Sequence, residues 1–174
     1  IGNQTAKVSN EKNLFFQGYK RKNGKAGTRN YIGLISTVNC SATVVKKIAD
    51  QINESDVIKK NKNIDGVVCL KHSSGCGMNT DGYGMQVFNH TIEGFKTHPN
   101  FSRVFVIGLG CECAQISLYK NKDQDNSIVY LNIQDEGGTK KIINKVCSLI
   151  YEQLPDLNNV KREPIPISEL VVAL

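Results

Sequence analysis

Hydrophobic stretches rich in β-branched residues alternate with amphipathic stretches along most of the chain. The predicted strands are 31–37, 65–70, 103–109 and 127–133, and the predicted helices are 42–53, 83–96, 114–119 and 138–154. Strands that alternate with helices in this way are typical of a parallel sheet with helices on both faces. The pattern therefore predicts a three-layer α/β/α fold of Rossmann-like type, with a mainly parallel sheet of four or five strands.

Two of the predicted helices carry a clear apolar stripe. Hydrophobic side chains recur at helical spacing on one face, and charged side chains lie largely opposite, so the stripes are interpreted as core. The stripe residues are Val44, Val45, Ile48, Ala49 and Ile52 in the first helix and Ile142, Ile143, Val146, Leu149 and Ile150 in the last. The last helix is expected to end before Pro155, because proline removes a backbone donor.

The ends of the chain differ in character from its middle. Residues 1–17 are mostly polar and are expected to be a linker or disordered segment, and 18–157 form the α/β domain. Residues 158–174 include two prolines, which exclude a regular helix, and are expected to be an extended connection to a further domain. The chain stops on a short apolar run, so we expect it to be a piece of a longer protein.

Composition narrows the class of protein. The 174 residues carry a net charge of +6 and are 40% hydrophobic, which is typical of a soluble globular domain. No apolar run approaches the roughly 20 residues of a membrane helix, and no secretory signal is recognised, so a cytoplasmic location is expected. The lysines are scattered without interleaved aromatic residues, which disfavours nucleic acid as a partner. A small anionic substrate suits the charge.

Three of the six cysteines directly follow predicted strands. They are Cys40, Cys76 and Cys111, and the carboxyl ends of parallel strands meet at one edge of a sheet, where ligands bind. Three convergent thiolates suit a soft metal ion or an iron–sulfur cluster with one open position. The alternative interpretation is that they are free core cysteines, as we expect for Cys69 and Cys147.

Other polar residues near the same strand ends are candidates for chemistry. His72 precedes Cys76 by four residues and can serve as a metal ligand or proton carrier, or be structural. The pairs Gly75-x-Gly77 and Gly108-x-Gly110 allow backbone amides to approach an oxyanion closely. Arg29 lies just before the first parallel strand, and its guanidinium can pair bidentately with a carboxylate.

Six motifs resemble the central domain of the altronate dehydratase and galactarate dehydratase family. Together they extend over 18–174 in the expected order. They are Gly-Tyr-Lys-Arg (18–21), Gly-Lys-x-Gly-Thr-Arg-Asn-Tyr (24–31), Thr-Val-Asn-Cys-Ser-Ala (37–42), His-Pro-Asn-Phe (98–101), Gly-Leu-Gly-Cys-Glu (108–112) and Pro-Ile-Pro-x-Ser-Glu-Leu (164–170). The large subunit of sulfolactate sulfo-lyase is similar through two of these motifs, which leaves a sulfite-eliminating relative as the nearest alternative.

The resemblance implies a hydro-lyase that dehydrates a sugar acid to a 2-keto-3-deoxy acid. It implies iron, as Fe²⁺ or a cluster, or another divalent metal such as Mn²⁺, together with flanking N- and C-terminal domains and a homo-oligomer. From their positions at the strand ends, we expect Cys40, Cys76 and Cys111 to hold the metal, and Glu112 or His72 to carry protons. The expected substrate-binding residues are Arg29, Asn30, Asn39, Ser41, Gly75, Gly77 and Gly110.

Two other classes of function remain open. The segment can be a non-catalytic scaffold or oligomerisation domain, with the chemistry elsewhere in the enzyme. Alternatively, Cys111 and Cys113 can act as a redox pair, which predicts a reversible disulfide. Glu112 can also be an ordinary solvated residue at a helix start, where acidic side chains are favoured.

Overall fold

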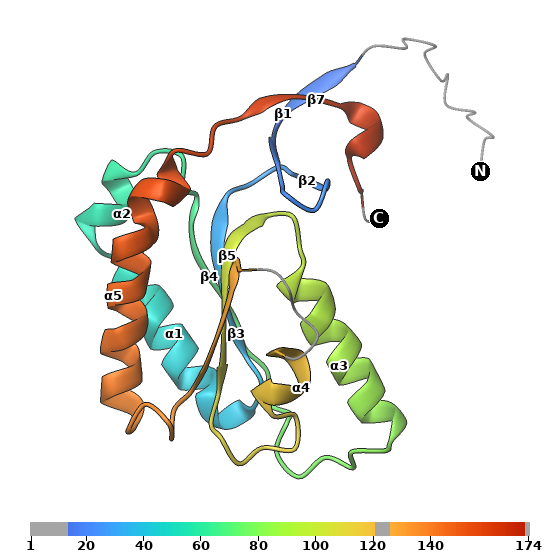
Figure 1. The fold of residues 1–174 in the computed structure, drawn as a ribbon, viewed down its shortest axis with the longest axis vertical. Coiled ribbons are helices and arrows are strands. Elements are labelled where there is room, and N and C mark those ends of the chain that lie inside the picture. The colour runs from blue at the N-terminus through green and yellow to red at the C-terminus, as the bar shows by residue number, and fades with distance from the viewer. Residues whose placement is uncertain (1–13, 121–125, 173–174) are drawn as a thin grey trace, which may run out of the picture.

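A computed structural model describes residues 14–120 and 126–172 of the chain. Its main feature is a four-stranded sheet with the strand order β4-β3-β5-β6, in which every neighbouring pair is parallel (Figure 1). The strands are β3 (Tyr31–Ser36), β4 (Gly66–Leu70), β5 (Phe101–Gly108) and β6 (Ile128–Asn132). All four predicted strands are observed, and the predicted three-layer α/β fold is confirmed.

Helices cover both faces of this sheet. The helices are α1 (Asn39–Asn53), α2 (Asp56–Lys60), α3 (Tyr83–Lys96), α4 (Ile116–Lys120) and α5 (Thr139–Asn158). Figure 1 shows α1 and α5 on one face of the sheet and α3 and α4 on the other. No helix within 14–120 or 126–172 is long and apolar enough to cross a membrane.

A separate hydrophobic core fills each side of the sheet. The core under α1 and α5 includes the two predicted apolar stripes, with Ile48, Ile52, Ile142 and Ile150 fully buried. Cys147 lies in this core, where burial raises the pKa of its thiol. The core under α3 and α4 is smaller and includes Tyr119, whose pKa burial also raises.

Helix α5 continues past the point at which the sequence predicts its end. Pro155 lies inside the helix, which ends at Asn158. Leu154 is buried and Leu157 packs against the same core, so the last turn gains contacts with the core. This packing offsets the loss of one backbone hydrogen bond at the proline.

A small antiparallel sheet joins the two ends of the described chain. Its strands are β1 (Phe15–Lys20), β2 (Ala26–Gly27) and β7 (Glu163–Pro166), in the order β2-β1-β7, followed by the short helix η1 (Ile167–Glu169). Residues 15–17, which the sequence assigns to a linker, pair with 164–166 of β7. This pairing is not apparent from local pattern, because its partners are far apart in sequence. The rest of the predicted linker, 1–13, lies outside the described residues.

Candidate functional site

The strand order creates a topological switch point between β3 and β5. From β3 the chain crosses through α1 to β4 on one side, and from β4 it crosses through α3 to β5 on the other side. Open α/β sheets bind ligands outside the carboxyl ends of the strands at such a point. The loops that follow β3, β4 and β5 form this edge, which we call the rim and define as 37–43, 71–77 and 109–113.

Thr37 connects all three loops of the rim. Its backbone N–H donates to the carbonyl oxygen of Ile107 at 3.2 Å, and its hydroxyl donates to Oε1 of Glu112 at 2.8 Å. A Cβ placed on Gly75 would lie 2.3 Å from the Thr37 carbonyl oxygen, so the β4 loop also lies directly against this residue. The segments that carry Cys40, Cys76 and Cys111 therefore interlock around one fully buried threonine.

Glu112 holds the β5 loop closed. It is 4% exposed, and its carboxylate accepts hydrogen bonds from the Thr37 hydroxyl, the Leu109 N–H and the Gly110 N–H at 2.8, 3.1 and 2.6 Å. Gly108 leaves the space that this carboxylate occupies, because a Cβ there would lie 2.3 Å from Glu112 Oε1. Glu112, which was expected to carry protons, is thus buried, and its carboxylate is occupied by two backbone N–H groups and one hydroxyl.

His72 has both ring nitrogens engaged with backbone groups. Nδ1 accepts the N–H of Ser74 at 3.1 Å, so Nε2 carries the proton and donates to the Ser36 carbonyl oxygen at 2.8 Å. The ring also meets Phe88 of α3 edge-on, with 4.9 Å between ring centroids. In this arrangement His72 braces the β4 loop against β3, the structural alternative that the sequence left open.

The other polar candidates on the rim divide into occupied and accessible groups. The Ser41 hydroxyl is buried and contacts the Val38 and Ile107 carbonyl oxygens at 3.0 and 2.8 Å. The Gly110 N–H is used by Glu112, and Gly75 is buried. In contrast, Asn39 and Gly77 are exposed.

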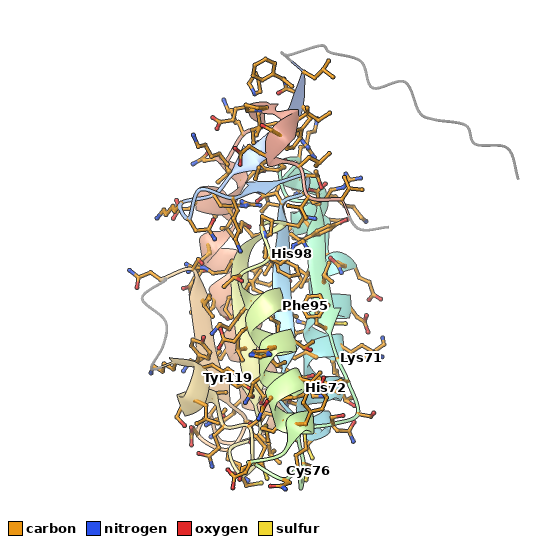
Figure 2. All side chains as sticks on the ribbon, turned by 90° about the vertical axis from the view of Figure 1, so that its right-hand side faces the viewer. Lys71, His72, Cys76, Phe95, His98 and Tyr119 are labelled. Atoms are coloured by element: carbon orange, nitrogen blue, oxygen red, sulfur yellow. The ribbon has the colours of Figure 1, made fainter. Side chains whose placement is uncertain are left out.

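All three candidate cysteines are exposed free thiols on the rim. Figure 2 shows Cys76 at the lower end of the molecule, with His72 and then Lys71 above it. Within the described part of the chain, no three His, Cys, Asp or Glu side chains come together as ligands of a metal ion. The three loops converge, but the thiols do not fit a shared metal site built by this chain's described side chains.

A cavity of about 320 Å³ lies on the rim between the start of α1 and the loop after β4. The six residues that line it are Asn39, Ala42, Thr43, Lys46, Lys71 and His72. Asn39, Thr43 and Lys46 follow one another at the spacing of one helix face, and Lys71 directly follows β4. Helical spacing was the sequence signal for Lys46, and the position directly after a strand was the signal for Lys71; neither lysine was among the predicted site residues.

Arg29 and Asn30 lie at the opposite edge of the sheet, which we call the amino edge. Both precede β3, whereas the rim follows it, so six residues or roughly 20 Å of strand separate them from Thr37. Arg29 contacts Asp65 at 3.3 Å, and Asn30 is fully buried. The structure therefore does not bring these two expected substrate ligands to the rim.

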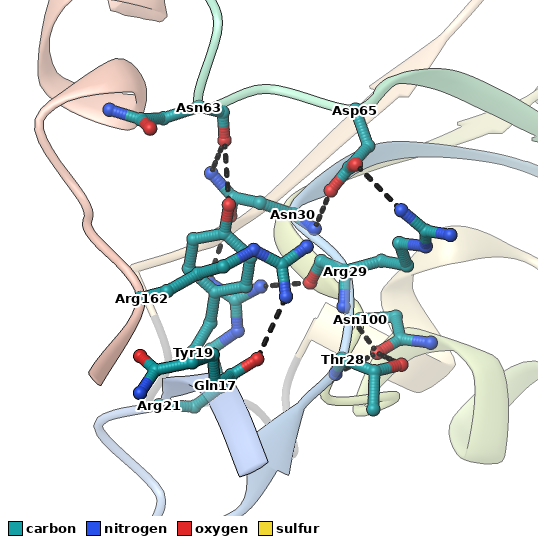
Figure 3. Close-up of polar contacts among 10 residues, drawn as sticks. All are labelled: Gln17, Tyr19, Arg21, Thr28, Arg29, Asn30, Asn63, Asp65, Asn100 and Arg162. Carbon is teal, nitrogen blue, oxygen red and sulfur yellow. Dashed lines mark hydrogen bonds and ion pairs between the residues drawn. The ribbon is translucent and has the colours of Figure 1, made fainter. Parts of the chain in front are cut away.

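Asn30 is the centre of a cluster of hydrogen bonds at the amino edge, which we call the latch and define as Asn30 with its partners Arg21, Asn63, Asp65 and Leu157. Figure 3 shows the first four of these residues. Its amide donates to the carbonyl oxygens of Asn63 and Leu157, and its Oδ1 accepts from Arg21 at 3.0 Å. Its backbone N–H donates to Asp65 at 2.6 Å. These contacts join the loops before β3 and β4 to the end of α5.

Arg21 extends the latch to the small sheet. Its guanidinium also donates to the carbonyl oxygens of Pro99 and Arg29, at 2.7 and 2.9 Å. The ring of Tyr19 lies between the guanidinium groups of Arg21 and Arg162, at 5.4 and 4.6 Å from its centroid. The Gly-Tyr-Lys-Arg and Thr-Arg-Asn motifs therefore contribute to a structural joint.

Comparison with known proteins supports the resemblance read from these motifs. The family model described as D-galactarate dehydratase/altronate hydrolase, second domain, matches residues 18–158. The chain is 31% identical over 169 residues to altronate dehydratase of Bacillus subtilis (strain 168), which covers 95% of this chain and 32% of that protein.

Two relatives from Escherichia coli (strain K12) match to a similar extent. Galactarate dehydratase (L-threo-forming) is 35% identical over 168 residues, and altronate dehydratase is 32% identical over 164 residues. Each alignment covers 91% of this chain but only 32% and 31% of the respective relative. The chain thus spans about a third of the length of the curated relatives it matches.

Proposed function

The chain belongs to the D-galactarate dehydratase/altronate hydrolase second-domain family, and we propose that it is the central domain of a hydro-lyase that dehydrates a sugar acid. The proposed product is a 2-keto-3-deoxy acid. The observation that carries this proposal is the match over 18–158, together with relatives named altronate and galactarate dehydratase. Flanking domains of the same enzyme and a second copy of the chain are the proposed partners.

Within that enzyme, the role we assign to this domain is to hold a rigid rim. Dehydration beside a carboxylate requires a base for the proton on carbon and an acid for the departing hydroxyl. Glu112 is occupied by three donors, and both nitrogens of His72 are engaged. The proton-transferring groups are therefore proposed to lie in parts of the enzyme outside this chain.

The same reasoning applies to the expected iron or manganese. Its ligands must be correctly placed and deprotonated donors, and residues 14–120 and 126–172 contain no convergent set of three His, Cys, Asp or Glu. We propose that a divalent metal, where the enzyme uses one, is held by other domains. No step of the reaction is assigned to a metal on this chain.

Metal analysis of the longer enzyme tests the location of the metal. The triple variant Cys40→Ala, Cys76→Ala, Cys111→Ala is prepared anaerobically, and bound iron and manganese are measured beside keto-acid formation. We expect metal content equal to that of the unmodified enzyme and turnover within a few-fold of it. Loss of the metal would show that the three thiols are metal ligands and would contradict the proposal. Cys69→Ala is the control for a cysteine outside the rim.

A substrate screen tests the reaction itself. The longer enzyme is incubated with aldonic acids, aldaric acids and sulfolactate, and keto acid and sulfite are measured separately. Keto-acid formation from a sugar acid without sulfite is the expected result. Sulfite release from sulfolactate would establish the alternative elimination, and no product from any of these compounds would overturn the hydro-lyase proposal.

A further inference from the structure

We propose that the rim cavity beside Lys71 is a binding subsite for a carboxylate group of a small polyhydroxylated acid. This inference rests on the proposed function, because a sugar acid is then the ligand at hand. The cavity measures about 320 Å³ and lies between the first two turns of α1 and the loop after β4. Such a volume holds a small organic acid without requiring the loops to open.

The electrostatics of the lining favour an anion. Two of the six lining residues, Lys46 and Lys71, are cationic, and none of the six is acidic. Lys71 is exposed and makes no ion pair with a carboxylate of the described residues. A ligand carboxylate can therefore pair with the Lys71 ammonium group without competing with a carboxylate of the described residues.

Lys46 contributes a second, partly neutralised charge. It donates to Asp50 one turn further along α1, and this hydrogen bond raises the pKa of the lysine above its ordinary value. Asp50 does not line the cavity. A ligand carboxylate thus competes with Asp50 for Lys46. Lys71 is therefore the main cationic contact for the ligand, and Asp50 weakens binding.

The remaining lining residues suit a ligand that also carries hydroxyl groups. Asn39 and Thr43 are exposed and offer an amide and a hydroxyl, each of which both donates and accepts. The His72 ring forms a wall that its two backbone hydrogen bonds hold in place. The combination of ammonium, amide and hydroxyl groups matches a hydroxylated carboxylic acid better than an apolar one.

Titration of the 174-residue chain with galactarate tests this subsite. Binding is followed by NMR shifts of backbone amides in 39–46 and 71–76, with the uncharged polyol galactitol and inorganic phosphate as parallel probes. We expect galactarate to shift these amides and galactitol to leave them unchanged. Phosphate binding without galactarate binding would overturn the assignment to a carboxylate, and no shift with galactarate would do the same.

Three single substitutions at exposed or half-exposed side chains sharpen the test. Lys71→Gln is expected to weaken galactarate binding about five-fold, the upper end of the range for losing one exposed ion pair. Asp50→Asn is expected to tighten binding about two-fold, because Lys46 is released. Lys47→Gln on the same helix is the matched control and should change nothing, since Lys47 does not line the cavity. Equal effects of the two lysine substitutions would show general attraction to the basic surface and contradict the subsite.

The longer enzyme separates failure of this inference from failure of the proposed function. If keto acid forms from a sugar acid and Lys71→Gln raises KM about five-fold with kcat unchanged, both proposals hold. An unchanged KM in an active enzyme overturns the subsite alone. An enzyme inactive on every sugar acid overturns the proposed function, whatever the isolated chain binds.

Discussion

At the amino edge of the sheet, Asn30, Asp65 and Arg21 tie together the loops that precede the strands, whereas at the rim Thr37 and Glu112 tie together the loops that follow them. At each edge a fully buried side chain, Asn30 or Thr37, bonds to a group far away in sequence. The two edges differ in what lies on their outer surface. The amino edge attaches the small sheet of β1, β2 and β7, while the rim presents thiols and lysines to solvent.

This difference shows why the most recognisable motif residues are not the best candidates for chemistry. Arg29 and Asn30 belong to a motif that resembles a known enzyme family, yet their contacts are with this chain's own loops (Figure 3). The accessible polar groups of the rim, such as Lys71 and Asn39, come from less conspicuous positions. Recognition of a family and location of a site are therefore separate questions.

Removing Glu112 is expected to damage the rim most. Glu112→Ala leaves the Thr37 hydroxyl and the Leu109 and Gly110 N–H groups without their acceptor. Hydrogen bonds to a charged group are each worth about 1.5–3 kcal/mol, so we expect a loss of about 4.5 kcal/mol in the free energy of unfolding, the lower end of the range for three such bonds. Urea denaturation measures it. Glu112→Gln keeps the shape of the side chain and should lose about half as much stability. Equal stability of the unmodified protein and both variants would contradict the role of Glu112 in holding the β5 loop closed.

The corresponding change at the amino edge is Asn30→Ala. It removes, at a fully buried position, the amide that donates to the Asn63 and Leu157 carbonyl oxygens and accepts from Arg21. We expect a loss of about 3 kcal/mol, somewhat less than at Glu112 because the lost group is neutral. The same denaturation measurement applies. Asn61→Ala, at an exposed side-chain contact within one turn of α2, serves as control, and an equal effect there would remove the special role of Asn30.

Alanine substitutions at two glycines of the β4 loop should separate the cost of a steric contact from the cost of a positive φ angle. Gly75 has φ +94°, and its added Cβ would lie 2.3 Å from the Thr37 carbonyl oxygen, so Gly75→Ala is expected to cost about 2 kcal/mol. Gly77 has φ +65° but open space around its Cβ position, which makes Gly77→Ala the matched control at about 1 kcal/mol. A Gly75→Ala protein as stable as the control variant would mean that the loop does not bear on Thr37.

The smallest expected effect is at the surface of the amino edge. The Arg29 side chain is 56% exposed and contacts Asp65 at 3.3 Å, so Arg29→Ala should change the free energy of unfolding by about 0.5 kcal/mol. Asp65→Ala should cost more, because Asp65 also accepts the Asn30 N–H. In the longer enzyme, Arg29→Ala is expected to leave KM for the sugar acid unchanged. A large rise in KM would place Arg29 at the substrate after all.

Much of the architecture follows from short-range pattern. The helix predicted for 83–96 is observed with those bounds, and the predicted strands agree within two residues at each end. Local information was insufficient at Pro155 and at 15–17. In the first case contacts of Leu154 with the core outweighed a helix-breaking residue, and in the second the strand partner lies near the other end of the chain.

The site was predictable in outline but not in its chemistry. Parallel topology brought the segments of Cys40, Cys76 and Cys111 to one rim, as their positions after the strands implied. It did not reveal that Glu112 and His72 use their polar atoms on backbone groups, or that Arg29 lies at the other edge. Residue type and spacing predict the strand end at which a residue lies. They do not predict its hydrogen-bond partners, because those depend on how the loops pack in the folded protein.

The sequence by itself determined the alternation of strands and helices, the apolar stripes and the family, because propensity, periodicity and motifs are properties of neighbouring residues. Only the tertiary structure decided which polar groups are occupied and which remain accessible. The physical reason is that hydrogen bonds inside the fold join distant residues: Thr37 and Glu112 are 75 positions apart, and Asn30 and Leu157 are 127 apart. Satisfaction of buried polar groups depends on such pairs, so the boundary between scaffold and site became visible only after folding.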